Sequence, residues 1–201
     1  MTKETKWMSQ SFWKKIAIWT TSVMLLILMA LTFDTVKQIT EGSERVPSYS
    51  VINNKIFYEF DKDRDILAPS IGGPAPLFGQ KLSESDAEEL INLGKLTIQA
   101  KNCMNCHTIL GNGAYYAPDL TKAWLDKGWG SESVRETLML NFLIDPEKNA
   151  RSFGTNRKMP NLNITESEAK GVVAYLKWMS SIDTNGFPAH FESIKQVKEE
   201  K

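Results

Sequence analysis

Both cysteines of the chain and one of its two histidines lie within five residues, in the sequence Cys103-Met-Asn-Cys106-His107. At this spacing two thiols and an imidazole can tether a haem, bind a metal ion or form a redox pair. A zinc site needs a second ligand pair, and the chain has no third cysteine and only one other histidine, His190. A thioredoxin-like pair needs a βαβ setting, and a disulfide across three residues closes too small a loop to stabilise much.

Covalent attachment of a c-type haem is the chemistry that fits the motif. Positions 103, 106 and 107 are related as i, i+3 and i+4, so we expect one helical face to present all three side chains. The thiols of Cys103 and Cys106 then add to the haem vinyl groups, and His107 binds the iron. The motif therefore predicts one covalent haem c.

The iron of such a haem needs a second axial ligand. Met159 lies in the loop sequence Asn-Arg-Lys-Met-Pro, just before the last predicted helix, and is the ligand that we predict. His190, beyond that helix, is the alternative. The other candidates lie within the tether or on apolar helix faces: Met104, Met139 and Met179. A histidine–methionine pair raises the reduction potential, which suits electron transfer.

Pro118 follows the motif within the same loop and is a candidate for support of the histidine. Its carbonyl oxygen could accept a hydrogen bond from Nδ1 of His107, which would fix the tautomer and the ring angle. A proline that only shapes the loop is an equally good interpretation.

The elements that must position this chemistry begin with an apolar segment, residues 16–33, which holds no charged side chain. A helix of about 20 residues crosses the hydrocarbon core of a membrane. The segment is apolar on all sides, unlike a core helix, and it lacks the small-x-small site of a cleaved signal peptide. Lysines precede it and mixed charges follow, which predicts a cytoplasmic N-terminus and an external chain from residue 34 onward.

Three amphipathic helices follow, which we expect near residues 83–103, 131–145 and 165–182. A capping box is predicted at the start of the first helix, formed by Ser85 and Glu88, and at the start of the last, formed by Thr165 and Glu168. The first and last helices are also expected to cross closely, because Gly94 would admit the aromatic ring of Tyr175.

Residues 36–82 differ from the helical part. The run 55–60 alternates weakly, as a strand does, whereas the Pro/Gly-rich run 68–79 is expected to be irregular. Residues 61–65 begin like a calcium loop, but Ile66 and Gly72 occupy the positions of its glycine and glutamate, so a solvated turn is expected.

The predicted fold is therefore all-α, with one N-terminal transmembrane helix, a small class-I-like cytochrome c domain and an irregular or short-strand insert between them. The expected divisions are an anchor at 1–35, a linker or added lobe at 36–82 and a mono-haem domain at 83–201. The chain of 201 residues carries 24 basic and 24 acidic side chains. With a net charge of zero, nothing indicates nucleic-acid binding.

Three stretches, CMNCHTILGNGAYYAPDL, RKMPNLNITESEA and YLKWMSSIDTNGFP, resemble the small cytochrome c subunit of bacterial cytochrome c-dependent nitric oxide reductase. The resemblance covers the anchor and residues 90–188. The run from Gly113 to Pro118 is not required by a generic cytochrome c. The chain departs from the family in its longer segment 40–85 and in Ile98, which stands where an aromatic residue is usual.

The resemblance implies an electron-transfer subunit that is not an enzyme on its own. Its partner would be a membrane subunit with haem b and a haem–non-haem-iron centre, which reduces nitric oxide to nitrous oxide. Electrons would come from a periplasmic donor, a cytochrome c or a cupredoxin, and would pass through the c haem to haem b. The chain would be a single-pass protein of the bacterial inner membrane with its haem domain in the periplasm.

The resemblance also implies a calcium ion at the subunit junction, with the carbonyl of Gly113 and the hydroxyl of Tyr115 among its ligands. Two other functions compete: a mono-haem subunit of a haem–copper terminal oxidase, and a free membrane-tethered cytochrome c shuttle. A shuttle needs a flexible polar tether, but residues 46–80 are rich in aromatic and aliphatic side chains. The oxidase subunit does not explain the tyrosine-bearing turn.

Overall fold

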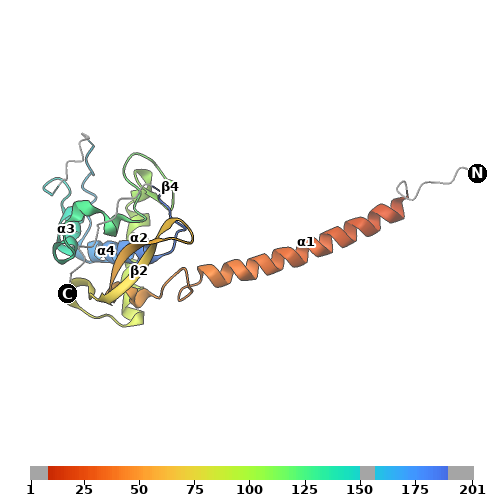
Figure 1. Ribbon diagram of the computed structural model, residues 1–201. Helices are drawn as coiled ribbons and strands as arrows, with labels where there is room; N and C mark the ends of the chain where they lie inside the picture. Colours follow the sequence, from red (N-terminus) through yellow and green to blue (C-terminus); the bar gives the residue numbers. More distant parts are fainter. Residues whose placement is uncertain (1–8, 150–156, 190–201) are drawn as a thin grey trace, which may run out of the picture.

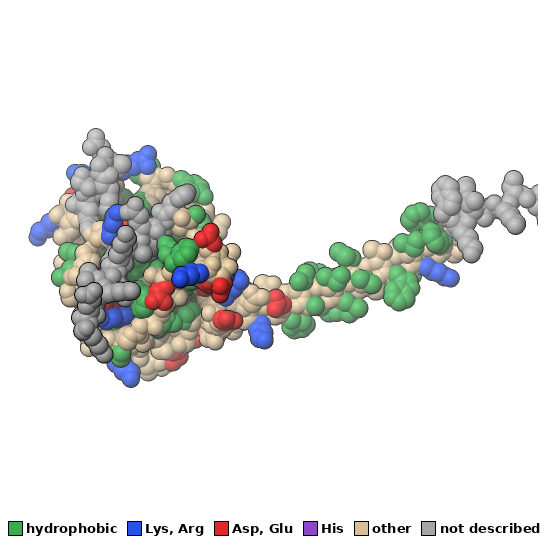
Figure 2. Space-filling view, viewed as in Figure 1, with side chains coloured by type: hydrophobic (Ala, Val, Ile, Leu, Met, Phe, Trp, Pro, Cys, Tyr) green, Lys and Arg blue, Asp and Glu red, His purple; other side chains and the backbone are tan. Residues whose placement is uncertain are grey.

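The computed structural model describes residues 9–149 and 157–189. A long helix, α1 (Gln10–Ile39), extends away from the rest of the chain (Figure 1). The side chain of Ser9 accepts a hydrogen bond from the amide of Phe12 and caps its first turn. Apolar side chains cover α1 along its length, with charges toward its two ends (Figure 2), and none of its residues is buried. This helix is long and apolar enough to cross a membrane, which is compatible with the predicted anchor.

Three helices frame the remainder: α2 (Glu84–Ala100), α3 (Glu132–Ile144) and α4 (Glu166–Ser181). α2 and α4 pack against each other most extensively, and α3 packs on α4. Their apolar faces meet in one buried cluster, to which the two helices contribute mainly aliphatic side chains: Ala87, Ile91 and Ile98 from α2, and Val172, Val173 and Leu176 from α4. Met139 and Met179 are buried in this core, as their positions on apolar helix faces predict.

The crossing of α2 and α4 depends on two glycines that face each other. A Cβ atom on Gly94 would lie 2.0 Å from the carbonyl oxygen of Gly171, and one on Gly171 would lie 2.8 Å from the amide nitrogen of Gly94. The backbones therefore touch, which only glycine allows. The prediction of a close crossing is correct, but the predicted partner is wrong: Gly94 meets Gly171, one turn before Tyr175, and admits backbone and not an aromatic ring.

The helix starts agree with the sequence at α4 and differ at α2. Thr165 and Glu168 form the predicted capping box. At α2 the predicted pair Ser85 and Glu88 is wrong, because Ser83 is the N-cap and accepts from the amide of Asp86. The helix starts early because the carboxylate of Glu84 accepts hydrogen bonds from the amides of Tyr49 and Ser50, at 2.6 and 3.0 Å, and fixes the first turn to the preceding segment.

That preceding segment holds a β-hairpin of β1 (Asn54–Asp61) and β2 (Ile66–Pro74), paired antiparallel from Asn54 opposite Pro74 to Asp61 opposite Ile66. The strand predicted at 55–60 is confirmed, as is the turn at 61–65. The expectation that residues 68–74 are irregular is wrong. In a two-stranded sheet each strand has a free edge, so β2 tolerates prolines whose missing N–H would break a central strand.

Two short 3₁₀ helices flank the hairpin, η2 (Tyr49–Asn53) and η3 (Leu77–Gly79). The segment does not form a separate core, because its buried aliphatic side chains join the α2–α4 cluster: Val51, Ile52, Ile56 and Leu77. Polar contacts add to this packing. The amine of Lys177 donates to the carbonyl of Ala75 at 2.9 Å, and the indole of Trp178 donates to the carbonyl of Pro47 at 3.1 Å. Residues 49–79 thus pack on α2 and α4. The domain boundary expected at residue 82 remains a prediction.

Short elements fill the connection from α2 to α3. They are η4 (Cys103–Asn105), β3 (Thr108–Ile109), β4 (Asn112–Gly113), η5 (Ala123–Leu125) and η6 (Lys127–Trp129). The described chain is therefore mostly helical with short strands, as the sequence predicts, and this connection carries the motif with the two cysteines.

Candidate haem site

The Cys-x-x-Cys-His motif lies just after α2 and not on it. The backbone of Asn102 is left-handed, with φ of 53°, which ends the helix. Cys103 then begins a tight turn, in which its carbonyl accepts from the amides of Cys106 and His107 at 3.1 and 3.0 Å. The expectation of one regular helical face is therefore wrong, although the turn still gathers the three side chains. Both thiols are free and half-buried.

The imidazole of His107 has a fixed orientation. Its Nδ1 lies 2.7 Å from the carbonyl oxygen of Pro118, which is the contact that the sequence suggested. A carbonyl only accepts, so Nδ1 carries the proton and donates, and in the neutral ring Nε2 keeps its lone pair. His107 can therefore offer Nε2 to a metal ion.

The loop that follows His107, residues 108–120, folds back on the motif through backbone hydrogen bonds. The amide of Ala114 donates to the carbonyl of Met104 at 3.0 Å, and that of Ala117 donates to the carbonyl of Cys106 at 2.8 Å. The amide of Leu120 closes the loop on the carbonyl of Thr108 at 2.7 Å. These bonds place the Pro118 carbonyl beside the imidazole.

Gly113 makes this close return possible. Its φ is +125°, and a Cβ atom there would lie 2.2 Å from the carbonyl oxygen of His107. Side chains rarely adopt such a backbone conformation, and the nearest atom is backbone that cannot move aside. The glycine is thus required by the geometry of the loop itself, whatever else binds there.

Asp119 fixes the loop from inside. One carboxylate oxygen accepts from the Thr108 hydroxyl at 2.6 Å and from the Gly111 amide at 3.3 Å, and the other accepts from the Thr121 amide at 2.8 Å. The Thr121 hydroxyl in turn accepts from the Leu110 amide at 2.7 Å. Asp119 is therefore engaged within the loop, and sequence reasoning did not single it out.

The tip of the loop exposes two tyrosines. Tyr115 is 81% exposed, and its hydroxyl donates to the carbonyl of Gly111 at 3.0 Å. Tyr116 is 52% exposed. The tip thus presents aromatic rings, a hydroxyl and backbone carbonyls to solvent.

The loop that carries Met159, residues 157–164, lies against both flanks of the motif. Nη1 of Arg157 donates to the carbonyl of Tyr116 at 2.6 Å. Nζ of Lys101, two residues before Cys103, donates to the carbonyl of Asn163 at 3.1 Å. The structure thus brings the loop of the half-buried Met159 to the segments around Cys103 and His107. The alternative ligand, His190, lies outside the described residues.

Two buried side chains, Trp124 and Arg135, carry hydrogen-bond donors that lack acceptors among the described residues, and the sequence did not predict this. Trp124 is fully buried, and the Arg135 guanidinium and the Lys177 amine each lie 5.1 Å from its ring centroid. Neither Nε1 of Trp124 nor Nε of Arg135 has a hydrogen-bond partner among the described residues. Burial lowers the pKa of Arg135 and lowers that of Lys177 to about 8. Two buried donors without acceptors favour an anion there.

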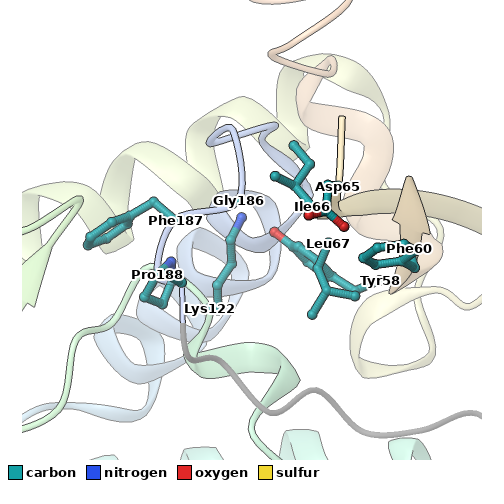
Figure 3. A pocket seen from close by; sticks show the side chains of 10 residues that line it. Tyr58, Phe60, Asp65, Ile66, Leu67, Lys122, Gly186, Phe187 and Pro188 are labelled. Atoms are coloured by element: carbon teal, nitrogen blue, oxygen red, sulfur yellow. The ribbon is translucent and has the colours of Figure 1, made fainter. Parts of the chain in front are cut away.

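A cavity of about 240 Å³ lies near the end of the loop 108–120, between the β1–β2 hairpin and residues 186–189 (Figure 3). The amine of Lys122 and the hydroxyl of Tyr58 point toward each other in it. Lys122 is buried and donates to the carbonyl of Ile182 at 2.9 Å, and its amine lies 4.7 Å from the Tyr58 ring centroid. Burial lowers its pKa to about 8. Lys122 therefore joins the end of the loop to the hairpin and to the end of α4.

The other chemistries proposed for the motif gain no support from the geometry. Burial raises the pKa of the Cys103 thiol, whereas a reactive redox cysteine needs a lowered one. Within residues 9–149 and 157–189, no three side chains of His, Cys, Asp or Glu gather to hold a metal ion. Two thiols and one oriented imidazole are the donor set of a c-type haem.

Comparisons with known proteins agree with this donor set. A family model for cytochrome c matches residues 91–180. The nitric oxide reductase C subunit of Stutzerimonas stutzeri is 33% identical over 115 residues, which cover 57% of this chain and 75% of that protein. The proteins of the same name from Halomonas halodenitrificans and Paracoccus denitrificans are 32% and 28% identical over 106 and 107 residues. These matches cover 51% and 53% of this chain, and 67% and 70% of the relatives.

Proposed function

The chain belongs to the family of nitric oxide reductase C subunits, the cytochrome c subunits of that complex, and we propose that it carries electrons to a catalytic membrane subunit without catalysing a reaction itself. Electrons enter from a periplasmic donor, a cytochrome c or a cupredoxin, and leave to haem b of the partner. That partner reduces nitric oxide to nitrous oxide. The proposal is supported by the relatives' name and by a site that can hold a haem on both sides.

In this proposal Cys103 and Cys106 tether a single haem through thioether bonds, and His107 and Met159 are the axial ligands. The free thiols and the Nε2 lone pair of His107 support the first three roles. The contacts that bring the Met159 loop to the motif support the fourth. The haem supplies one-electron exchange, and two protein ligands leave its iron no open position for a substrate.

The buried donors fit the same group. A haem carries two carboxylates, and Nε1 of Trp124 and Nε of Arg135 are buried donors that lack acceptors among the described residues. A carboxylate would accept from both, and its negative charge would lie near the positive charges of Arg135 and Lys177 beside the Trp124 ring. We therefore assign these two side chains to a haem propionate.

The proposed location follows from α1 and the lysines before it. α1 serves as a single-pass anchor in the bacterial inner membrane, with its N-terminus in the cytoplasm and the haem domain in the periplasm. The haem domain then lies on the side where c-type haem is attached and where periplasmic donors reach it. The exposed apolar surface of α1 supports this placement.

The proposal also includes a calcium ion at the junction with the partner, with the Gly113 carbonyl and the Tyr115 hydroxyl as ligands. Both groups lie at the exposed tip of the loop, and oxygen ligands suit calcium. The nearby carboxylate of Asp119 is engaged by three donors within the loop. The remaining ligands therefore come from the partner.

Tyr115→Phe tests the calcium role, with Tyr116→Phe as the matched control one residue away. We expect Tyr115→Phe to leave the haem spectrum unchanged, to lower the calcium content of the purified complex and to slow electron passage to haem b. Tyr116→Phe keeps calcium and rate. Normal calcium content and turnover in Tyr115→Phe would exclude the hydroxyl as a ligand.

The observation that carries the proposal is the pair of free thiols beside an imidazole whose Nδ1 is engaged by Pro118. Purification of the full chain in detergent tests the function. A haem-b subunit should accompany it, and the pair should consume nitric oxide with a reduced donor, whereas a Cys103→Ser, Cys106→Ser variant should not. Consumption of oxygen instead would indicate the oxidase subunit, and isolation without a partner would indicate the shuttle.

A further inference from the structure

The Met159 loop has no helix or strand of its own between residues 157 and 164. Within the loop the structure describes one hydrogen bond, from the amide of Asn163 to the side chain of Asn161, at 2.8 Å, and the buried side chain is that of Ile164 at the end of the loop. A loop of this kind opens locally at low cost unless other segments hold it. The contacts of the Met159 loop with other segments therefore decide how firmly it is held near the haem-binding motif.

Arg157 holds the beginning of the loop to a single residue in two ways. Its Nη1 donates to the carbonyl of Tyr116, and its guanidinium lies 4.8 Å from the centroid of the Tyr116 ring. The planar guanidinium can bond and stack at once, which an amine cannot do in the same geometry. Tyr116 is two residues before Pro118, whose carbonyl orients His107. Arg157 thus ties the Met159 loop to the loop that supports the other axial ligand.

Lys101 holds the end of the loop. Its amine donates to the carbonyl of Asn163 and lies 3.6 Å from the carboxylate of Glu168. Glu168 in turn accepts from the amide of Thr165, at 2.8 Å, in the capping box of α4. Lys101 therefore joins the start of α4 to the segment just before Cys103.

We infer that Arg157 and Lys101 are positioning residues that hold the Met159 loop against the two flanks of the haem-binding motif, and so set how firmly Met159 binds the iron. The inference rests on the proposed axial role of Met159. A thioether is a soft ligand and binds ferric iron less firmly than ferrous iron. If the loop is held less firmly, the methionine should therefore be replaced by another ligand in the ferric protein first.

Arg157→Gln tests this in the full-length, haem-loaded protein in detergent. The ferric form is titrated with base, and the thioether-to-iron charge-transfer band is followed. We expect the band to disappear about one pH unit earlier than in the wild type, a roughly tenfold change in the ligand-exchange equilibrium, since a charge-assisted hydrogen bond is lost. Arg157→Lys should lie between the two. Lys101→Gln should shift the midpoint in the same direction, by less.

Lys62→Gln is the control, because Lys62 is exposed, has a positive charge too and lies in the turn between β1 and β2, outside both loops. Its midpoint should equal that of the wild type. If Arg157→Gln and Lys62→Gln behave alike, or if Arg157→Gln lowers thermal stability without moving the midpoint, the positioning role is wrong. If the wild type itself shows no thioether band, the axial role of Met159 fails instead, so the two failures are distinguishable.

Discussion

The two loops that meet at the proposed haem are built differently. The loop after His107 is closed on the motif by backbone hydrogen bonds, by a glycine that no other residue can replace and by the carboxylate of Asp119. The Met159 loop is attached by two basic side chains and by the buried side chain of Ile164 at its end, and Arg157 is exposed. The loop on the histidine side, residues 108–120, is therefore closed by its own backbone. The loop on the methionine side, residues 157–164, is attached to the rest of the domain through side chains.

This difference predicts which side yields first. Backbone bonds inside a closed loop break only when the loop unfolds, but a side chain at the surface exchanges its partner for water at little cost. An electron-transfer site gains from a fixed imidazole, because the haem keeps its place when the other ligand bond weakens. We expect perturbations of the methionine side to change the iron ligand, and perturbations of the histidine side to change the stability of the whole domain.

The largest expected effect removes the frame that both loops share. Gly94→Ala would place a methyl group 2.0 Å from the carbonyl oxygen of Gly171, so α2 and α4 must separate. We expect a loss of more than about 3 kcal/mol in the free energy of unfolding and little haem-loaded protein. Gly73→Ala, with open space around the site, is the control. Equal stability of the two variants, measured by denaturant unfolding, would contradict the crossing.

The next effect concerns the histidine side alone. Gly113→Ala puts a methyl group 2.2 Å from the carbonyl oxygen of His107, whereas Gly111→Ala meets only the Phe187 ring, at 3.5 Å. Both glycines have positive φ, so both variants carry a strain of about 1–2 kcal/mol. Only Gly113→Ala should add a clash of about 2 kcal/mol and disturb the low-spin haem spectrum. Similar unfolding energies and spectra for the two would show that the loop can return to the motif without a glycine at position 113.

The smallest expected effect is a pH dependence of the free energy of unfolding. The pKa values of Lys122 and Lys177 are lowered by burial to about 8, below that of an unfolded lysine, so the unfolded state binds more protons above pH 8. Stability should therefore rise between about pH 8 and pH 9, by about 1 kcal/mol for each lysine. Denaturant unfolding of Lys122→Met and Lys177→Met should show a smaller rise than the wild type. The same rise in all three proteins would contradict the burial of these amines as charged groups.

Sequence reasoning reached the parts of the fold that local patterns encode. Local residue types are enough to predict the apolar run of α1, the capping box of α4 and the chemistry of the motif. The contact of Pro118 with His107 could also be anticipated, because a ligating histidine needs an acceptor for its second nitrogen. These features depend on neighbours close in sequence.

The features that sequence reasoning missed depend on contacts between distant segments. Gly171 looks like any helical glycine until α2 is laid across it, and Ser83 caps α2 because Glu84 is bound by the amides of residues 49 and 50. Strand β2 forms despite its prolines because it pairs on one edge only. Arg157 and Trp124 carry no local pattern that separates them from a surface charge and a core aromatic.

The central claim, that His107 and Met159 bind the iron of one covalent haem, is tested most directly by near-infrared magnetic circular dichroism of the ferric, full-length protein. We predict the charge-transfer band of a low-spin haem with imidazole and thioether ligands. In Met159→Ala the haem should stay attached, and this band should be lost in favour of an altered or high-spin form. A bis-imidazole band in the wild type, as His190 would give, or an unchanged band in Met159→Ala, would contradict the assignment.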